Sequence, residues 1–203
     1  MDILKSTLIG ISIGAIPGII FFEILRRTLT KGFLSGFLLS IGEFLGNFLV
    51  LLLIYFGFSQ LFTLKLTNVL LYLIGSLILG YIGIIAFKLT KENIEQSYKQ
   101  KVVDRSSLVA GFLIAITNPV AIALWLSLVG SYIQKLSKTS AVINIFFLAF
   151  GLVIFYFAMV TVVNLTKRKI PTKYILLLSK LFGAVLLFYA ISFLYNFLKL
   201  IMI

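Results

Sequence analysis

The sequence predicts an all-α integral membrane protein with six transmembrane helices, arranged as two inverted repeats of three helices. Three observations lead to this prediction: the composition is very apolar, apolar runs follow one another along the chain, and a proline interrupts the first and the fourth run. Hydrophobic residues make up 61% of the chain and charged residues only 12%, and the mean hydropathy is +1.16. Soluble domains are about 45–50% apolar and about 25% charged, so the solvent of this chain must be lipid.

Each apolar run has the length of about 20 residues that a helix needs to cross the hydrocarbon core of a bilayer. Charged residues gather mainly between the runs. The six expected helices cover residues 3–25, 33–58, 69–87, 108–132, 141–165 and 174–201.

One clearly aqueous segment, residues 88–105, lies at the middle of the chain and divides it. The expected units are a first three-helix repeat (1–88), a cytoplasmic linker (89–106) and a second three-helix repeat (107–203). Loops on the side of this linker carry twelve of the 18 Lys and Arg residues, and loops on the other side carry five. Cytoplasmic loops are enriched in Lys and Arg. The sequence therefore predicts a multi-pass protein of the cytoplasmic membrane with both termini outside.

Two proline breaks stand at matching places, Pro17-Gly18 in the first helix and Asn118-Pro119 in the fourth. Three crossings in each half is an odd number, so the halves would be inverted relative to each other. Matched breaks in inverted repeats are the best sequence pointer to the binding site of a transporter. A break also exposes a half-helix N-terminus, which suits an anionic group. A simple packing kink is the alternative interpretation.

Glu43 is the most informative residue because it stands inside an apolar run. It lies ten residues beyond Phe33, or about 15 Å along the helix, near the middle of the bilayer. A carboxylate there costs several kcal/mol unless it is protonated, paired or hydrated. We expect Glu43 to bind a proton or a substrate ammonium, with Asn47 one turn further on the same helix face. A carboxyl group that only holds helices together is the alternative.

Three other polar or aromatic residues near the apolar runs have a plainer interpretation. Glu23 and Lys180 lie near the cytoplasmic ends of their helices, and we expect both to reach the headgroups. An ion pair of Lys180 with Glu23 or Glu43 is left open. Trp125 is expected to be a packing residue or an interface anchor rather than a ligand.

Several classes of function are excluded. The chain has no Cys and no His, so thiolate and imidazole metal sites, thiol redox chemistry and catalytic histidines are absent. The basic residues lie in loops between apolar runs, which argues against a nucleic-acid partner. With a single deep carboxylate, no paired acid and base is found. We therefore expect no catalytic residue, no metal ligand, no cofactor and no enzyme activity.

The order of these motifs resembles the family of lysine exporters (LysE) and homoserine/threonine exporters (RhtB) over nearly the whole chain. That family shows a Pro-Gly-Pro motif in its first helix, spaced glycines with a Gly-Asp in its second, and Gly-Phe, Asn-Pro and aromatic residues in its fourth. The corresponding residues here are Pro17-Gly18-Ile19, Gly32, Gly36, Gly42-Glu43, Gly111-Phe112, Asn118-Pro119 and Trp125. The resemblance implies export of amino acids or related small solutes. Because Ile19 replaces the second proline, we expect a milder break in the first helix.

The resulting hypothesis is a proton-coupled secondary exporter. Its expected substrate site consists of Pro17, Gly18, Glu43, Asn47, Asn118 and Pro119, and Glu43 is expected to couple proton entry to substrate exit. The expected partners are an amino acid and the lipid bilayer. A homodimer is plausible, since six short helices are few for a closed pathway. The alternatives are a metal-ion exporter that uses carboxylate and carbonyl ligands, and a membrane scaffold or assembly factor that transports nothing.

Overall fold

The computed structural model describes residues 3–100, 104–131, 133 and 137–202, and these ranges contain helices and no strand. In chain order the elements are α1 (Ile3–Gly14), α2 (Ile19–Lys31), α3 (Phe33–Tyr55), η1 (Phe58–Phe62), α4 (Lys65–Lys88), α5 (Lys91–Gln100), α6 (Ser106–Ile116), α7 (Pro119–Ser131), α8 (Lys138–Thr166), η3 (Lys167–Lys169) and α9 (Thr172–Met202).

Within these ranges, four stretches are long and apolar enough to cross a membrane as single helices: α3, α4, α8 with η3, and α9. Two bent pairs, α1 with α2 and α6 with α7, pass the same test together. The described chain therefore has four spans, or up to six if each bent pair is one span. An all-helical membrane protein is confirmed.

The helix breaks lie where the prolines predict them. α1 and α2 meet at an angle of 73°, and α6 and α7 at 62°. Pro17 lies between α1 and α2, where its fixed φ and missing N–H cannot continue a helix. Pro119 is the first residue of α7, a position that tolerates a missing N–H. The first bend is the larger of the two, because residues 15–18 all leave the helical conformation whereas only two residues separate α6 from α7. The milder break expected from Ile19 in place of a second proline stays a prediction.

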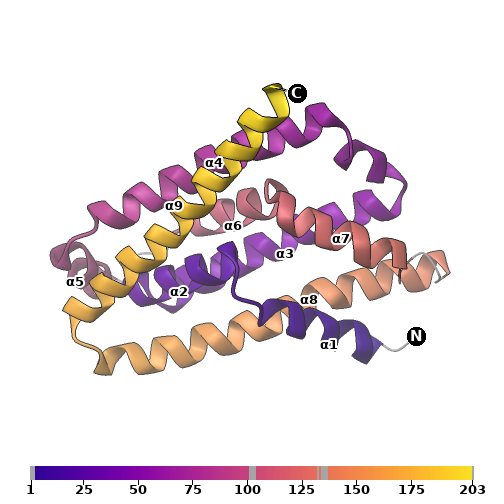
Figure 1. The fold of residues 1–203 in the computed structure, drawn as a ribbon. Coiled ribbons are helices and arrows are strands. Elements are labelled where there is room, and N and C mark those ends of the chain that lie inside the picture. The colour runs from indigo at the N-terminus through magenta and orange to yellow at the C-terminus, as the bar shows by residue number, and fades with distance from the viewer. Residues whose placement is uncertain (1–2, 101–103, 132, 134–136, 203) are drawn as a thin grey trace.

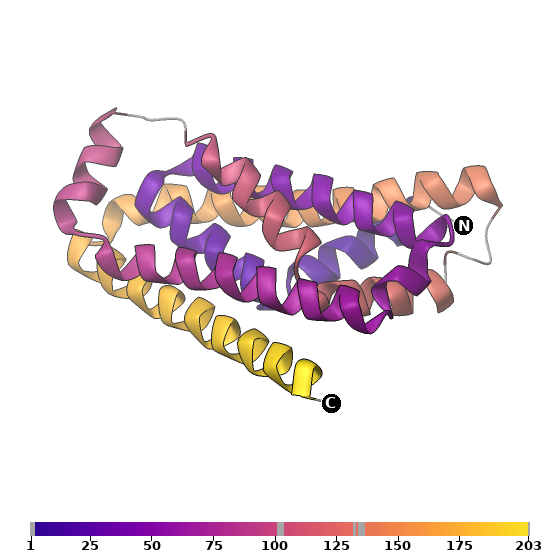
Figure 2. The ribbon, with the colours of Figure 1, turned by 90° about the horizontal axis from the view of Figure 1, so that it is seen from above.

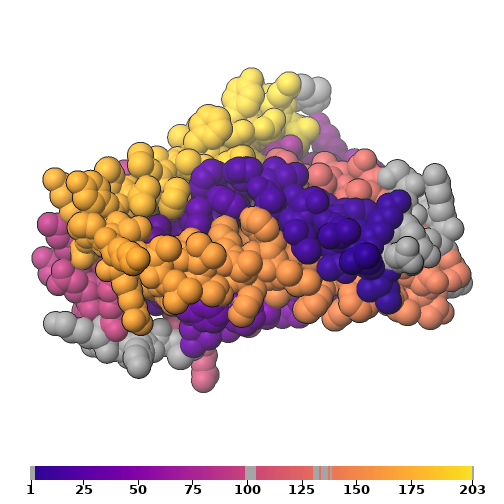
Figure 3. Space-filling view, turned by 90° about the horizontal axis from the view of Figure 1, so that it is seen from below, coloured from indigo at the N-terminus to yellow at the C-terminus, as the bar shows by residue number. Residues whose placement is uncertain are grey.

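The helices pack in reciprocal pairs. α1 lies along α8, α6 lies along α3, and α4 lies along α9. Figure 2 shows the α4–α9 pair at one side of the bundle, and Figure 3 shows α1 against α8 on the face seen from below. Each half of the chain thus packs the first part of its broken helix on the first long helix of the other half, and the second long helices of the two halves pack on each other.

Glycine makes the α3–α6 contact close. A Cβ added at Gly42 would collide with the carbonyl oxygen of Leu108, and one added at Gly111 would collide with that of Leu39. Neither backbone oxygen can move without moving its helix. Small residues let membrane helices approach each other in this way, and here the approach places α3, which carries Glu43, directly beside the first part of the second broken helix.

The surface of α9 suits a lipid environment. Phe188, Ile191 and Tyr195 are each about two thirds exposed (69%, 68% and 66%), and an apolar face of this kind is stable in contact with acyl chains.

α5 lies at one end of the bundle, and both chain ends lie toward the opposite end (Figure 1). α5 belongs to the segment that the sequence predicts as aqueous. It is amphipathic, because its Ile94 is buried against Leu29 and Ile175.

Candidate functional site

A cavity of about 150 Å³ lies where the two broken helices pass α3. A cavity of this volume elsewhere holds a molecule of the size of benzene. Most of its wall is apolar, and a few polar groups converge on it, as is typical of small-molecule sites. The residues around it are Ile13, Ile16, Gly18, Ile19, Ile20, Glu43, Asn47, Ile114, Ala115, Asn118, Val120, Ala121, Leu124, Trp125, Leu152 and Tyr156.

Glu43 stands in the wall of this cavity at the middle of α3, the depth that the sequence predicts. Its side chain is almost fully buried, with 6% exposure. The Nδ2 group of Asn47 donates a hydrogen bond of 3.2 Å to Glu43 Oε1. Glu43 Oε2 is buried and has no hydrogen-bond partner among the described residues. A buried polar atom without a partner costs free energy, so this oxygen is ready to accept a bond from a ligand or to carry a proton.

Trp125 fixes the orientation of Asn47. The indole N–H of Trp125, on α7, donates to Asn47 Oδ1 over 3.0 Å. Because an indole N–H only donates, the amide oxygen of Asn47 must face it, which leaves the NH₂ group for Glu43. The chain Trp125–Asn47–Glu43 thus connects α7 to the carboxyl group on α3. Trp125 is 2% exposed and belongs to the buried core, so the expected packing role is confirmed and the alternative of an interface anchor is wrong. Its part in the polar network is not predicted from the sequence.

The two helix N-termini at the breaks differ in their capping. Asn118 Oδ1 accepts hydrogen bonds from the backbone N–H groups of Val120 (3.1 Å) and Ala121 (3.3 Å), so it caps α7. Gly18 precedes α2 with an extended backbone and supplies no side-chain cap. The first amides of a helix lack intrahelical acceptors and carry partial positive charge. The uncapped N-terminus of α2, beside the cavity, is therefore the better place for an anionic group.

The structure brings four of the six expected site residues together. Gly18, Glu43, Asn47 and Asn118 line the cavity. Pro17 and Pro119 are not in its wall and act by ending or starting a helix. Sequence reasoning missed Tyr156 of α8, which lines the cavity and is 2% exposed. Tyr156 stands in an apolar run without a polar neighbour, so only the packing of α8 on α3 reveals it.

A second polar network closes the α5 end of the bundle. Arg26 holds Glu23 with two hydrogen bonds of 2.7 Å, and Arg27 Nε donates a third of 2.6 Å. Glu23 and Arg26 are 0% and 2% exposed. The expectation that Glu23 reaches the headgroups is therefore wrong. Because α2 continues to Lys31, both arginines lie on the same helix as Glu23, one turn away, and the carboxylate is paired instead of solvated.

Arg27 and Lys31 extend this network from α2 to the start of α6. Arg27 Nη1 donates to Ser107 Oγ over 2.8 Å and lies 3.4 Å from Asp104 Oδ2. Lys31 Nζ lies 2.5 Å from the same Asp104 oxygen. Burial alone would raise the pKa of Asp104, but hydrogen bonds from Lys31 and Ser106 and the charges of Lys31 and Arg27 outweigh it and lower this pKa to about 2. These contacts join the two halves of the chain.

Lys180 belongs to neither network. It is partly buried on α9, and the ion pairs of the described residues include none between Lys180 and either glutamate. The pairing that the sequence leaves open is therefore not formed. In the described ranges, His, Cys, Asp and Glu side chains do not gather in any group of three or more that could hold a metal ion.

These features define a class: a multi-pass membrane protein in which two broken helices and a buried carboxyl group meet at one cavity. Comparison with known proteins makes the assignment specific. The sequence profile of the family described as LysE type translocator matches residues 11–197, and the chain belongs to this family. Its members are translocators and not enzymes, as the sequence predicts.

A relative from Bacillus subtilis (strain 168), named "Putative amino acid efflux protein YcgF", is 30% identical over 136 residues. The aligned part covers 66% of this chain and 65% of that protein, so the chain matches just under two thirds of the relative's length. No solved structure matches the chain.

Proposed function

We propose that the protein is a secondary exporter that carries amino acids or related small solutes out across the cytoplasmic membrane in exchange for protons. One observation carries the proposal: Glu43 Oε2, a buried carboxyl oxygen that has no hydrogen-bond partner among the described residues, lies at a cavity between two helix breaks. Membership of a translocator family and similarity to a protein named for amino acid efflux support it.

A zwitterionic amino acid has two charged ends, and the cavity offers a complementary group for each. The substrate ammonium would bind Glu43 Oε2, and the substrate carboxylate would bind the uncapped N-terminus of α2 at Gly18. Asn47 would hold Glu43 in place, and Asn118 would shape the opposite wall by capping α7. Pro17 and Pro119 would contribute by fixing the two breaks. Charge-assisted hydrogen bonds of this kind are short and strong.

Proton coupling follows from competition for one carboxyl group. A protonated Glu43 is neutral and binds an ammonium weakly, whereas an ionised Glu43 binds it well. A proton from the outside would bind Glu43 and displace the substrate to the outside. Release of that proton into the cytoplasm would restore the binding site. One proton would then enter for each solute that leaves. The net process is exchange, driven by the proton gradient.

The two halves, residues 1–88 and 107–203, would form inverted repeats joined by the linker 89–106. The reciprocal packing of α1 on α8 and of α6 on α3 supports this arrangement. Alternating access would then rock one repeat against the other. The contacts of Arg27 and Lys31 with Ser107 and Asp104 join the repeats at the α5 end and would act as the inner gate.

In the orientation that we propose, this inner gate faces the cytoplasm and both termini lie outside. The described Lys and Arg side chains at the α5 end come from α2, α4, α5, η3 and α9 and from Arg105, which precedes α6, and this basic side is expected to face the cytoplasm. A homodimer stays an expectation from the sequence, and light scattering of the protein in detergent would test it.

The experiment is efflux from liposomes that contain the purified protein and are loaded with a mixture of amino acids, under an imposed proton gradient. We expect selective efflux in the wild type and a loss of at least tenfold in Glu43→Gln. Glu95→Gln is the matched control, because it makes the same chemical change at an exposed carboxylate on α5. It should transport like the wild type.

The other outcomes would change the proposed mechanism or the proposed function. Selective efflux that survives in Glu43→Gln would keep the exporter and remove the coupling role of Glu43. Efflux of a divalent cation instead of any amino acid would indicate a metal-ion exporter. No efflux of either kind from folded protein would favour the membrane scaffold or assembly factor.

A further inference from the structure

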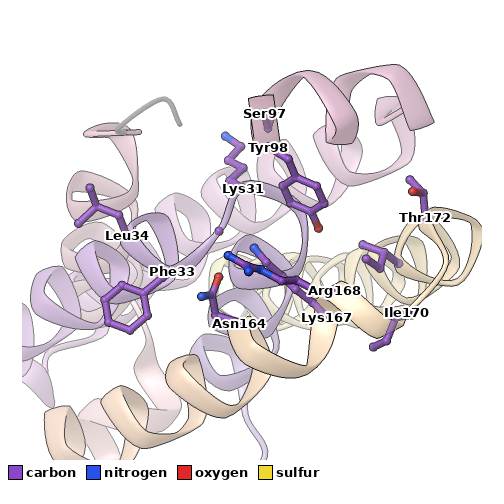
Figure 4. Close-up of a pocket in the computed structure, with 12 residues that line it drawn as sticks. Lys31, Phe33, Leu34, Ser97, Tyr98, Asn164, Lys167, Arg168, Ile170 and Thr172 are labelled. Atoms are coloured by element: carbon purple, nitrogen blue, oxygen red, sulfur yellow. The ribbon is translucent and has the colours of Figure 1, made fainter. Parts of the chain in front are cut away.

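A second and larger cavity, of about 820 Å³, lies at the α5 end of the bundle, away from Glu43. Its wall is built by the α2–α3 junction, α5, the end of α8 with η3, and the start of α9. Figure 4 shows its basic side chains, Lys31, Lys167 and Arg168, with Tyr98 of α5 and Asn164 of α8 around the same space. None of the described residues that line it is acidic.

In the part of the chain that the structure describes, two of the three cations have no carboxylate partner. Lys31 is paired with Asp104. Among the described residues, no Asp or Glu forms an ion pair with Lys167 or Arg168. The whole chain has only six acidic residues, and the buried Glu23 and the partly buried Asp104 are already held by Arg26, Arg27 and Lys31. The wall therefore carries a net positive charge.

Lys167 is the unusual member of this group, because it is 7% exposed. Its ammonium donates one hydrogen bond of 3.1 Å to the carbonyl oxygen of Thr28 and lies 4.6 Å from the centre of the Tyr98 ring. An ammonium group can donate three hydrogen bonds, and burying a charge is costly unless it is paired. An anion in the pocket would provide the missing partner.

The remaining wall fits an amphipathic anion. Asn164 and Thr172 offer neutral polar groups, while Phe33 and Leu34, which is 41% exposed, lie at the same cavity. Leu34 belongs to the first turn of the membrane-spanning helix α3, so the cavity lies at the boundary between membrane and water. Basic pockets between transmembrane helices at this level bind anionic lipid headgroups.

We propose that this pocket is a binding site for a phosphate group, supplied by the headgroup of an anionic phospholipid. The phosphate would lie between Lys167 and Arg168, and an acyl chain would run along Leu34. The site is separate from the cavity at Glu43 and does not depend on the proposed transport function. Because Lys167 and Tyr98 also bind the backbone of α2, the occupant would stabilise the junction of α2, α5 and η3.

The test measures binding of phosphatidylglycerol to the purified full-length protein by native mass spectrometry, with phosphatidylcholine as the neutral lipid. Inorganic phosphate is tested separately as the free anion, by thermal unfolding against chloride at equal ionic strength. Arg168→Gln removes one cation of the site, and Lys169→Gln is its matched control, since Lys169 is the next residue of η3 and lies outside the cavity wall.

We expect phosphatidylglycerol to bind the wild type in preference to phosphatidylcholine, with about fivefold weaker binding in Arg168→Gln and unchanged binding in Lys169→Gln. Lys167→Gln should weaken binding at least as much, and Lys167→Arg, which keeps the charge, should retain it. Stabilisation by inorganic phosphate that Arg168→Gln loses would support the same site with free phosphate as its source. Equal binding by Arg168→Gln and Lys169→Gln, or no preference for either anion, would overturn the proposal.

Discussion

At the scale of single residues, the cavity at Glu43 depends on one orientation of one amide. Asn47 can give its NH₂ group to Glu43 only because Trp125 occupies its oxygen. Both residues are 2% exposed, so water cannot easily replace a lost partner. The network therefore sets which carboxyl oxygen of Glu43 is left for a ligand.

Removing the indole N–H tests this network. Trp125→Phe would leave Asn47 Oδ1 buried without a donor, and we expect it to lower the free energy of unfolding by about 1–3 kcal/mol and to weaken substrate binding. Denaturation in detergent and the substrate concentration at half-maximal efflux are the measurements. In a double-mutant cycle with Asn47→Leu, purely additive losses would mean that the hydrogen bond contributes nothing.

Asp104 gives a prediction about pH. Its pKa falls from an ordinary 3.8 to about 2 in the folded protein. A group with a lowered folded pKa adds stability that is fully present above its unfolded pKa and is lost as the pH falls through its folded pKa. We therefore expect the thermal stability of the wild type in detergent to fall between about pH 4 and pH 2, and more steeply than that of Asp104→Asn. Parallel curves for the two proteins would contradict the ion pairing of Asp104 with Lys31 and Arg27.

At the scale of elements, close approach of helices decides where the site residues meet. α3 can carry Glu43 to the second broken helix only because Gly42 and Gly111 let the two backbones touch. The α2–α3 junction needs a glycine for another reason: Gly32 has a φ of 101°, in the region that side chains rarely adopt.

Gly42→Ala should force α3 and α6 apart. The new methyl group meets the carbonyl oxygen of Leu108, which belongs to the backbone and cannot rotate away, and overpacking of this kind typically costs about 1–3 kcal/mol. Gly80→Ala in the middle of α4 is the control, because its methyl group would make an ordinary contact of 3.9 Å with Ala190 and would favour the helix. Unfolding in detergent should show a loss for Gly42→Ala and none for Gly80→Ala; equal stabilities would argue against the tight α3–α6 contact.

At the scale of the whole molecule, local signals in the sequence predict the architecture and long-range packing decides the site. The breaks at Pro17 and Asn118-Pro119 are predictable because proline acts on its own turn. The depth of Glu43 follows from its place in an apolar run. The role of Trp125 and the presence of Tyr156 are not predictable, since each depends on which face of α7 or α8 meets α3. The expected exposure of Glu23 to the headgroups is wrong because the apolar run ends before α2 does. The helix continues to Lys31 and so places Arg26 and Arg27 one turn from Glu23.

The absence of cysteine from the chain allows a direct test of the orientation. Single cysteines can be introduced at two exposed positions near opposite ends of the bundle, Gln96→Cys on α5 and Thr63→Cys after η1. If the basic α5 end is cytoplasmic, a membrane-impermeant maleimide should label Thr63→Cys in intact cells and Gln96→Cys only after permeabilisation. The reverse pattern would place the termini inside, turn the network of Arg27 and Asp104 into an outer gate, and require the proton to enter from the opposite side of Glu43.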